Sequence, residues 1–376
     1  MAAPANSAPR RSRRWRIVFA APLAVLAPLL LLATCGPPAD PAIHFGGLRP
    51  PLAEPAVLAP VAPSFTEDAF LTSDGTRLPL RKWLPKGPET AVVLALHGFN
   101  DYSNGFEIPA KLWASRGIAT YAYDQRGFGA ASGRGRWAGE GRLTVDAIVA
   151  SRILRRAYPG RKLILLGESM GGAVAVLAAT GAMTGVIPGP DGMPVAEADG
   201  LVLSAPAVWG RATMDLLPRL ALFAGVRLFP EMTLTGRGLQ IRASDNVAML
   251  QALARDPMVL KGARIDTMYG LVDLMDDALA AAPRLAMPLL LMYGAHDQLV
   301  PRPAMAVFAA RLPPDSGDRR RLAYYPKGYH LLLRDLDGEG VAADVAGWIA
   351  EPGAPLPSHA DAATATTWPP PARAGE

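Results

Sequence analysis

The chain has 376 residues, of which 50% are hydrophobic and 19% charged, a balance typical of a globular enzyme and not of a disordered chain. Its net charge is +5, but five arginines precede the first acidic residue, and without them 33 basic residues remain against 33 acidic ones. The body is therefore close to neutral, which argues against a nucleic-acid partner. The one cysteine, Cys35, excludes an intramolecular disulfide and a cysteine-rich metal site.

The first 35 residues have the pattern of an export signal. Five arginines precede an apolar run from Ile17 to Ala33, and Thr34-Cys35-Gly36 follows, which is the order of a secretory signal. Leu32–Cys35 resembles the lipobox of bacterial lipoproteins, in which the cysteine becomes the acylated first residue. We therefore expect a protein of the cell envelope, exported or anchored by a lipid on Cys35. The alternative is an uncleaved helix that anchors the chain in the inner membrane.

Two further segments show little periodicity. Residues 36–63 are rich in proline and predict an extended linker. Residues 352–376 are rich in proline and alanine and predict a disordered tail. His44 and His359 lie in these segments and are poor candidates for catalysis.

Strands and helices alternate along the body of the chain. Short apolar runs bounded by turn residues predict strands, and amphipathic spacing predicts helices. The predicted strands are two within 69–84 around the turn 73–75, then 91–96, 118–124, 163–166, 200–203, 288–293 and 321–325, and the predicted helices include 106–115, 143–157 and 337–349. This alternation predicts an α/β fold with a mostly parallel central sheet and helices on both faces.

The alternation stops between residues 207 and 286. This stretch is helical in pattern, rich in leucine, and contains no convincing strand. An insertion of this size between strands predicts a helical cap over the active site. The core then consists of residues 64–206 and 287–351.

The stretch 163–176 reads LILLGESMGGAVAV and carries the clearest sign of chemistry. A strand runs into Gly-Glu-Ser-Met-Gly and a small-residue helix follows, which is the pattern of a nucleophile elbow with Ser169 at its tip. Gly167 and Gly171 suit this sharp turn because it leaves no room for a Cβ beside the serine. Ser169 is therefore the predicted nucleophile.

A glycine also follows the strand at 91–96, in His97-Gly98-Phe99. Gly98 lets the backbone turn so that an N–H points into the cleft. In serine esterases of this layout, an N–H of this loop and that of the residue after the nucleophile bind the oxyanion. We therefore predict an oxyanion hole made by the backbone N–H groups of Phe99 and Met170. His97 could itself be a base, but its place before the nucleophile favours a role in shaping the loop.

The base and the acid are predicted from chain order. Two of the five histidines lie in the flexible segments, His97 precedes the nucleophile, and His296 adjoins Asp297, which leaves His330 after the final strand. Asp297 lies just past the strand at 288–293. The sequence of Ser169, Asp297 and His330 matches the Ser…Asp…His order of this enzyme class. The competing acids lie in the cap, where a solvated face is the favoured interpretation: Asp273, Asp276 and Asp277.

The Gly-rich stretch 124–129 reads DQRGFG. A phosphate-binding loop needs a G-x-x-x-x-G-K pattern and a following helix, and neither is present. We predict a structural turn in which Asp124 and Arg126 pair or cap the backbone.

With these residues in place, the chain resembles the α/β-hydrolase superfamily and looks most like its monoacylglycerol lipase and lysophospholipase branch, which includes serine aminopeptidase-like hydrolases. The resemblance covers about residues 65–350 and rests on HGF (97–99), DQRGFG (124–129), GESMGG (167–172), GAHDQLVP (294–301) and KGYH (327–330), with Asp256-Pro257 in the cap. It implies an α/β-hydrolase fold and a carboxylic ester hydrolase, free of cofactor and metal, with a mobile cap and an apolar acyl pocket. Monoacylglycerol or lysophospholipid-type esters are the implied substrates.

Two other functions stay open. A serine aminopeptidase or amidase on the same triad needs an acid in the cap to hold the substrate amine, and Glu231, Asp273 or Asp276 could serve. A lipid-binding protein without catalysis is the second alternative, against which the intact set of Ser169, Asp297 and His330 speaks. We expect contact with a membrane surface through the N-terminus, and the sequence leaves the oligomeric state open.

Overall fold

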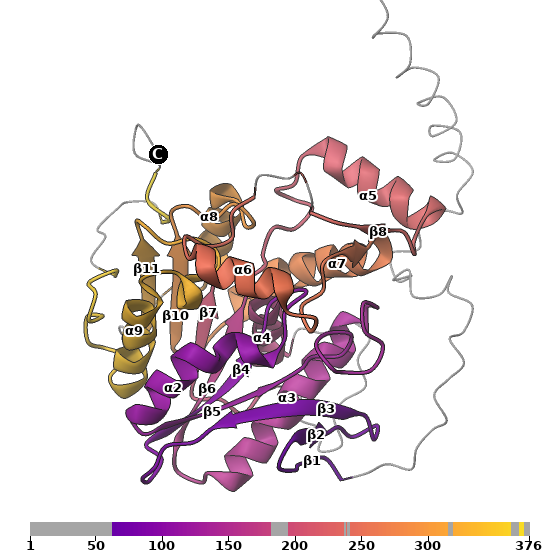
Figure 1. The fold of residues 1–376 in the computed structure, drawn as a ribbon. Helices are drawn as coiled ribbons and strands as arrows, with labels where there is room; N and C mark the ends of the chain where they lie inside the picture. Colours follow the sequence, from indigo (N-terminus) through magenta and orange to yellow (C-terminus); the bar gives the residue numbers. More distant parts are fainter. Residues whose placement is uncertain are drawn as a thin grey trace, which may run out of the picture. The chain divides into compact units, whose positions relative to one another are not determined.

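The computed structural model describes residues 62–181, 195–236, 238, 241–314, 319–361 and 368–371. Its centre is a nine-stranded sheet with the strand order β1-β2-β3-β5-β4-β6-β7-β10-β11 (Figure 1). In this order, the first three pairings, which join β1, β2, β3 and β5, are antiparallel. All the following pairings, which join β5, β4, β6, β7, β10 and β11, are parallel. This confirms the predicted α/β fold with a mostly parallel sheet. The strands are β1 (Ser64–Phe65), β2 (Ala69–Leu71), β3 (Arg77–Trp83), β4 (Ala91–Leu96), β5 (Ile118–Tyr123), β6 (Lys162–Glu168), β7 (Gly200–Ser204), β10 (Leu289–Gly294) and β11 (Arg320–Tyr325).

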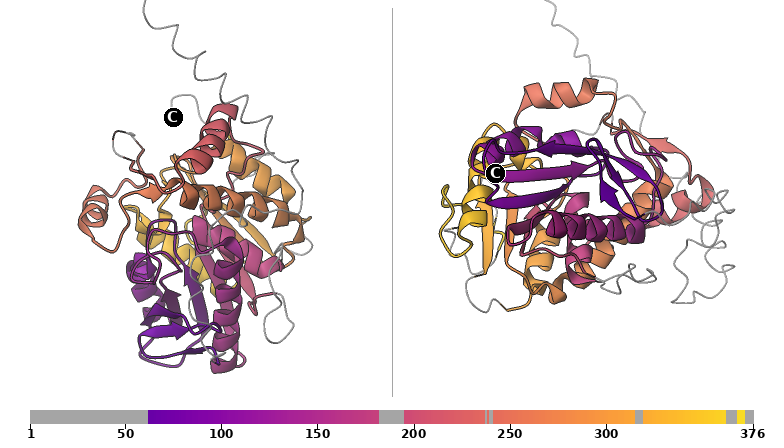
Figure 2. Two further views of the ribbon diagram at one scale, coloured as in Figure 1. Left: turned by 90° about the vertical axis from the view of Figure 1, so that its right-hand side faces the viewer. Right: turned by 90° about the horizontal axis from the view of Figure 1, so that it is seen from below.

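Helices cover both faces of the sheet (Figures 1 and 2). Side chains of β4 point alternately to the two faces. Val92, Leu94 and Leu96 pack in one apolar cluster with α3, α4, α7 and α8, and Ala91, Val93 and Ala95 pack in a second cluster with α2 and α9. Because both faces are covered, β4 is buried throughout and reads as a continuous apolar run. The helices are α2 (Glu107–Ser115), α3 (Glu140–Ala157), α4 (Met170–Thr180), α7 (Ile265–Ala281), α8 (Arg302–Arg311) and α9 (Gly338–Ala350).

The segment predicted as one helical cap has two parts. The cap itself holds α5 (Leu216–Leu228), α6 (Val247–Arg255) and an antiparallel pair, β8 (Thr233–Leu234) with β9 (Ala263–Arg264). α7, in contrast, buries one face in the main core and packs against α4. The structure thus contains a strand pair where none was predicted, since two-residue strands are too short to leave a periodic signal.

Helix α5 has no buried residue. It lies at the outer side of the cap (Figures 1 and 2), and its side chains include Leu217, which is 77% exposed, and Leu216, which is 66% exposed. Phe223, Leu228 and Phe229 are also exposed. Helix α5 thus exposes several large apolar side chains to solvent.

Part of the C-terminal segment predicted as disordered is packed on the core. Leu356 is buried, and the Tyr324 backbone N–H donates to the Ala360 carbonyl oxygen at 2.9 Å. Trp368 packs edge-on against Tyr293, with the ring centroids 6.2 Å apart. The composition of the tail predicts no helix or strand, but isolated apolar anchors fix it nonetheless.

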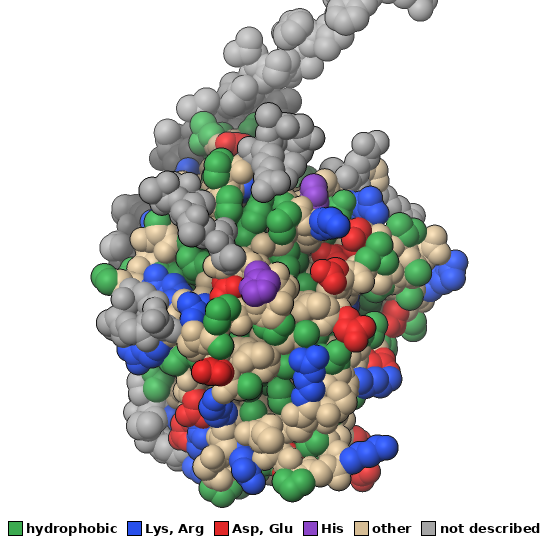
Figure 3. All heavy atoms as spheres, turned by 90° about the vertical axis from the view of Figure 1, so that its left-hand side faces the viewer, with side chains coloured by type: hydrophobic (Ala, Val, Ile, Leu, Met, Phe, Trp, Pro, Cys, Tyr) green, Lys and Arg blue, Asp and Glu red, His purple; other side chains and the backbone are tan. Residues whose placement is uncertain are grey.

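The side of the molecule that carries α9 bears charges of both signs (Figure 3). Lys and Arg side chains are interspersed there with Asp, Glu and apolar side chains. Such a mixed surface suits a body with little net charge.

The N-terminal predictions fall on residues 1–61, which lie outside the described residues. They are the export signal, the lipidation of Cys35 and nearly all of the linker. Within the part of the chain that the structure describes, every helix is too short or too polar to cross a bilayer.

Candidate active site

Ser169 lies between β6 and α4 at a strained turn. Its backbone has φ 52° and ψ −116°, a conformation that is rare for residues with a Cβ. The turn is tight, because a Cβ on Gly171 would lie 2.0 Å from the Leu96 carbonyl oxygen and one on Gly167 would lie 2.3 Å from the Gly171 carbonyl oxygen. Only glycine fits at both positions. The elbow therefore holds Ser169 at the carboxyl edge of the sheet.

Asp297 and His330 follow β10 and β11, so they reach the same edge. His330 Nδ1 lies 2.9 Å from Asp297 Oδ2, and both side chains are buried. The other carboxylate oxygen of Asp297 accepts the backbone N–H groups of Leu299 and Val300 at 2.8 and 3.0 Å. Because a carboxylate only accepts, Nδ1 of His330 carries a proton and donates it, which leaves the Nε2 lone pair for another partner.

The surroundings of His330 favour its protonated form. Burial lowers its pKa, but the charge of Asp297, the hydrogen bond to it and the charge of Glu168 outweigh this effect. The net result is a pKa raised above the ordinary value of 6.5. The site can therefore hold an imidazolium that forms during a reaction.

Ser169 and His330 line one cavity of about 290 Å³. Its wall is mostly apolar and comes from the core, from α7 and from the cap. The polar part of the lining consists of Asn100, Asp101, Glu168 and Arg334. The apolar part consists of Phe99, Ala207, Ala243, Leu253, Val259, Leu271, Met275, Leu299, Val300 and Leu331.

The loop after β4 contacts the elbow. A Cβ on Gly98 would lie 3.3 Å from the Ser169 Cβ, and Phe99 lines the cavity. Met170 is the first residue of α4, and N–H groups in the first turn of a helix have no acceptor within it. The predicted oxyanion donors Phe99 and Met170 are thus on the two segments that adjoin Ser169.

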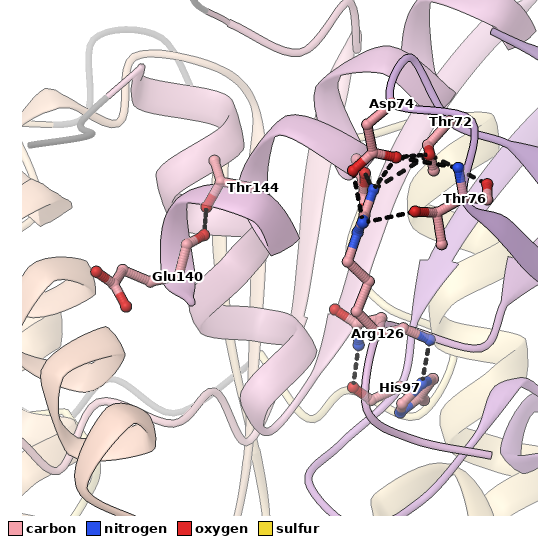
Figure 4. A network of polar contacts seen from close by, with 9 residues as sticks. Thr72, Asp74, Thr76, His97, Arg126, Glu140 and Thr144 are labelled. Carbon is pink, nitrogen blue, oxygen red and sulfur yellow. Dashed lines mark hydrogen bonds and ion pairs between the residues drawn. The ribbon is translucent and has the colours of Figure 1, made fainter. Parts of the chain in front are cut away.

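His97, at the start of this loop, hydrogen-bonds to the neighbouring DQRGFG turn (Figure 4). The Gln125 backbone N–H donates to His97 Nε2 at 2.9 Å, and His97 Nδ1 lies 2.8 Å from the Gly98 carbonyl oxygen. Since an amide N–H only donates, Nε2 accepts and Nδ1 carries the proton. Burial lowers the pKa of His97. A neutral imidazole with both nitrogens engaged shapes the loop, which is the role that its chain position favours.

The neighbouring DQRGFG turn is structural, and its two charged residues have separate partners. Arg126 pairs with Asp74 at 2.8 Å (Figure 4) and with Asp146 at 2.6 Å. Asp124 accepts the Ala130 backbone N–H at 2.8 Å. Asp124 thus caps the backbone and also lies 3.5 Å from Arg81, and Arg126 pairs with other acids.

Sequence reasoning missed a buried ionic cluster in the cavity wall. Arg334, in the 3-10 helix η4 (Leu332–Arg334), donates to Glu168 at 2.6 Å and pairs with Asp101 at 2.6 Å. Arg334 is 5% exposed, Glu168 2% and Asp101 8%. The sequence did contain a signal for this cluster. Glu168 is a charged residue directly before the nucleophile, and Arg334 is a charged residue four positions after His330, and the fold must bury both positions.

The acids considered as alternatives, of which Asp273 and Asp276 lie in α7 and not in the cap itself, do not line the cavity. Asp273 and Asp276 pair with Arg211 at 2.8 and 2.5 Å, and Glu231 pairs with Arg264 at 3.1 Å. Within the described residues, His, Cys, Asp and Glu side chains form no group of three that could hold a metal ion.

A comparison with protein families identifies the family of the chain. The family described as "Serine aminopeptidase, S33" matches residues 87–337, well over half of the chain and every residue of the site described above. The chain belongs to this family. As an S33 hydrolase, it is similar to the monoacylglycerol lipase of Mycolicibacterium smegmatis, at 27% identity over 77% of this chain and 98% of the relative. It is also similar to the monoglyceride lipase of Mus musculus, at 26% identity over 74% of this chain and 89% of that relative.

Solved structures share the fold of this chain. The monoacylglycerol lipase of Paleococcus ferrophilus has a TM-score of 0.58 and 22% identity, over 72% of this chain and 98% of its own. A soluble variant of the monoglyceride lipase of Saccharomyces cerevisiae has a TM-score of 0.59 and 19% identity, over 76% of this chain and 96% of its own. The α/β-hydrolase fold and the likeness to the monoacylglycerol lipase branch are thereby confirmed. The relatives named above are lipases, and the chain shares their fold.

Proposed function

We propose that the protein cleaves carboxylic esters by an acyl-enzyme mechanism with Ser169 as nucleophile, His330 as base and Asp297 as its partner. The observation that carries the proposal is the 2.9 Å contact between His330 and Asp297 beside the strained serine, in one apolar cavity. A serine hydroxyl is a weak nucleophile without an adjacent base, and a buried histidine–aspartate pair supplies one.

The steps follow from this arrangement. Ser169 Oγ attacks the ester carbonyl carbon while its proton passes to His330 Nε2, and Asp297 stabilises the imidazolium. The alcohol then leaves with that proton, so that the acyl group remains on Ser169. Water attacks the acyl-enzyme, gives a proton to His330 and releases the acid, and the proton returns to Ser169. In both steps the N–H groups of Phe99 and Met170 bind the oxyanion, where one donor contributes about 2.7–4 kcal/mol.

We propose monoacylglycerol or lysophospholipid-type esters as the substrates. The cavity wall is dominated by aliphatic side chains, which suits an acyl chain. The exposed apolar side chains of α5 suit contact with a lipid aggregate. The relatives named as monoacylglycerol and monoglyceride lipases support the same substrate class.

A serine aminopeptidase is the second candidate, and the family description favours it. Such an enzyme needs a free carboxylate in the cavity to hold the substrate amine. The acids that line the cavity, Asp101 and Glu168, both pair with Arg334. Glu231, Asp273 and Asp276 pair with arginines that do not line it. These pairings favour ester over peptide substrates.

The proposal extends to the place of action. An export signal with a lipid on Cys35, or an uncleaved anchor helix, brings the protein to the cell envelope and to a membrane surface that supplies its substrate. Metabolic labelling with a tagged fatty acid, in the wild type and in Cys35→Ala, tests the lipid anchor.

The catalytic proposal is tested by labelling with a fluorophosphonate probe together with ester and peptide p-nitroanilide turnover. We expect labelling and ester turnover in the wild type and neither in Ser169→Ala. Absence of labelling in the folded wild type supports a lipid-binding protein and contradicts catalysis. A series of p-nitrophenyl esters and monoacylglycerols of rising chain length tests the substrate class, since a flat and weak profile contradicts lipid substrates.

A further inference from the structure

The cluster of Arg334, Glu168 and Asp101 joins the three loops on which the proposed function depends. Glu168 directly precedes Ser169, Asp101 lies in the loop of the Phe99 oxyanion donor, and Arg334 lies in the turn after the catalytic histidine. One nitrogen of the guanidinium, Nη2, is 2.6 Å from Glu168 Oε1 and 2.6 Å from Asp101 Oδ2. A single atom therefore links the elbow, the oxyanion loop and the histidine loop.

Arg334, and Tyr102 next to Asp101, attach these loops to the cap. The Arg334 carbonyl oxygen accepts from the Asn246 side chain, which caps α6, at 3.2 Å. Asp101 accepts the Tyr102 backbone N–H at 2.9 Å, and the Tyr102 hydroxyl donates to Asp256 of the cap at 2.7 Å. Cap and catalytic loops thus share one set of contacts.

The charge of the cluster also acts on the histidine. Two carboxylates and one guanidinium give a net charge of −1 in a wall that His330 shares. Charges buried this deeply are weakly screened and interact strongly with their neighbours. The charged groups that act on His330 are Asp297 after β10, Glu168 at the end of β6 and Arg334 in η4.

We propose that Arg334 is a positioning residue, which fixes the three loops relative to one another through Glu168 and Asp101 and balances the charge beside His330. The inference rests on the proposed function and adds a residue to it. Within the cluster, the carboxylate of Glu168 raises the pKa of His330 and the guanidinium of Arg334 lowers it. The two residues therefore have opposite effects on the base.

The test measures kcat, KM and the acid limb of kcat/KM against pH on a soluble p-nitrophenyl ester. Arg334→Met should lower kcat about 10²-fold, the loss typical of a displacement of about 1 Å, with a smaller change in KM. It should also move the acid limb to higher pH, whereas Glu168→Gln should move it to lower pH. Arg334→Lys should restore most of kcat, because one ammonium nitrogen has three donors and can make both contacts.

Arg152→Met is the matched control. Arg152 is also a buried arginine with a carboxylate neighbour, Glu197 at 4.0 Å, but it does not line the cavity. It should lower the unfolding temperature without a shift of the acid limb. The inference is overturned if Arg334→Met behaves like this control, or if the Glu168→Gln shift has the same sign as that of Arg334→Met.

Three further outcomes keep the test decisive. If Arg334→Met does not fold, the Glu168→Gln shift and the recovery in Arg334→Lys decide the question. If Ser169→Ala keeps wild-type turnover, the proposed function itself is wrong. If Ser169→Ala is inactive but Arg334→Met has normal kcat and a normal pH profile, only the inference about Arg334 is overturned.

Discussion

Replacement of Gly171 by alanine tests whether the elbow depends on its close approach to the end of β4. An added Cβ would lie 2.0 Å from the Leu96 carbonyl oxygen and 2.8 Å from that of His97, whereas ordinary contacts begin at 3.4 Å. The two segments therefore have to separate by about 1.4 Å, which moves Ser169 away from the loop that carries Phe99. A displacement of about 1 Å costs about 10²-fold in rate, and overpacking costs about 1–3 kcal/mol of stability.

The assay for this variant combines kcat on a short p-nitrophenyl ester with equilibrium unfolding in urea. Gly171→Ala should lose about 10²-fold in kcat and about 1–3 kcal/mol in the free energy of unfolding. Gly87→Ala is the control, because a Cβ there meets nothing within 4 Å, and it should leave both quantities unchanged. Wild-type kcat and stability in Gly171→Ala would refute the reasoning from the close approach.

Three other features make separate predictions. Burial lowers the pKa of His330, but Asp297 outweighs this effect and the net pKa lies above 6.5. Since the base must be neutral, kcat/KM should decrease as the pH is lowered, with a midpoint above 6.5. A lower midpoint in the pH profile contradicts this. The double variant Leu217→Ser with Phe223→Ser should lower turnover of emulsified monoacylglycerol about tenfold or more, because each buried apolar side chain contributes about 1.5 kcal/mol to binding of the lipid surface. Turnover of soluble short esters should be unchanged. Equal loss on both substrates contradicts a surface role. Leu356→Ala should cost about 2–5 kcal/mol in urea unfolding, and a loss below about 0.5 kcal/mol would mean that the tail is not anchored there.

Much of the fold could be predicted because its strands are buried on both faces. Residues 91–96 and 289–294 form continuous apolar runs between turn residues, which mark central parallel strands without any tertiary information. Parallel strands then bring the loops after β6, β10 and β11 to one edge. The elbow motif and the chain order therefore predict Ser169, Asp297 and His330 as neighbours at that edge.

The remaining features depend on partners that are distant in sequence. The apolar spacing of α7 resembles that of a cap helix, and only the packing against α4 shows that it belongs to the core. The two-residue strands β8 and β9 exist because they pair with each other. Arg334 and Glu168 are 166 positions apart, so no local pattern could reveal their contact.

The packing of the C-terminal segment has a consequence for self-association. β11 is the last strand in the sheet order, and an edge strand offers free N–H and C=O groups to any extended chain. The Tyr324 N–H is occupied by the Ala360 carbonyl oxygen, and Arg321 of the same strand binds the Gly353 carbonyl oxygen. Residues 352–361 therefore protect this edge from pairing between molecules. A chain shortened before Leu356 should aggregate faster on heating even where its catalytic groups are intact.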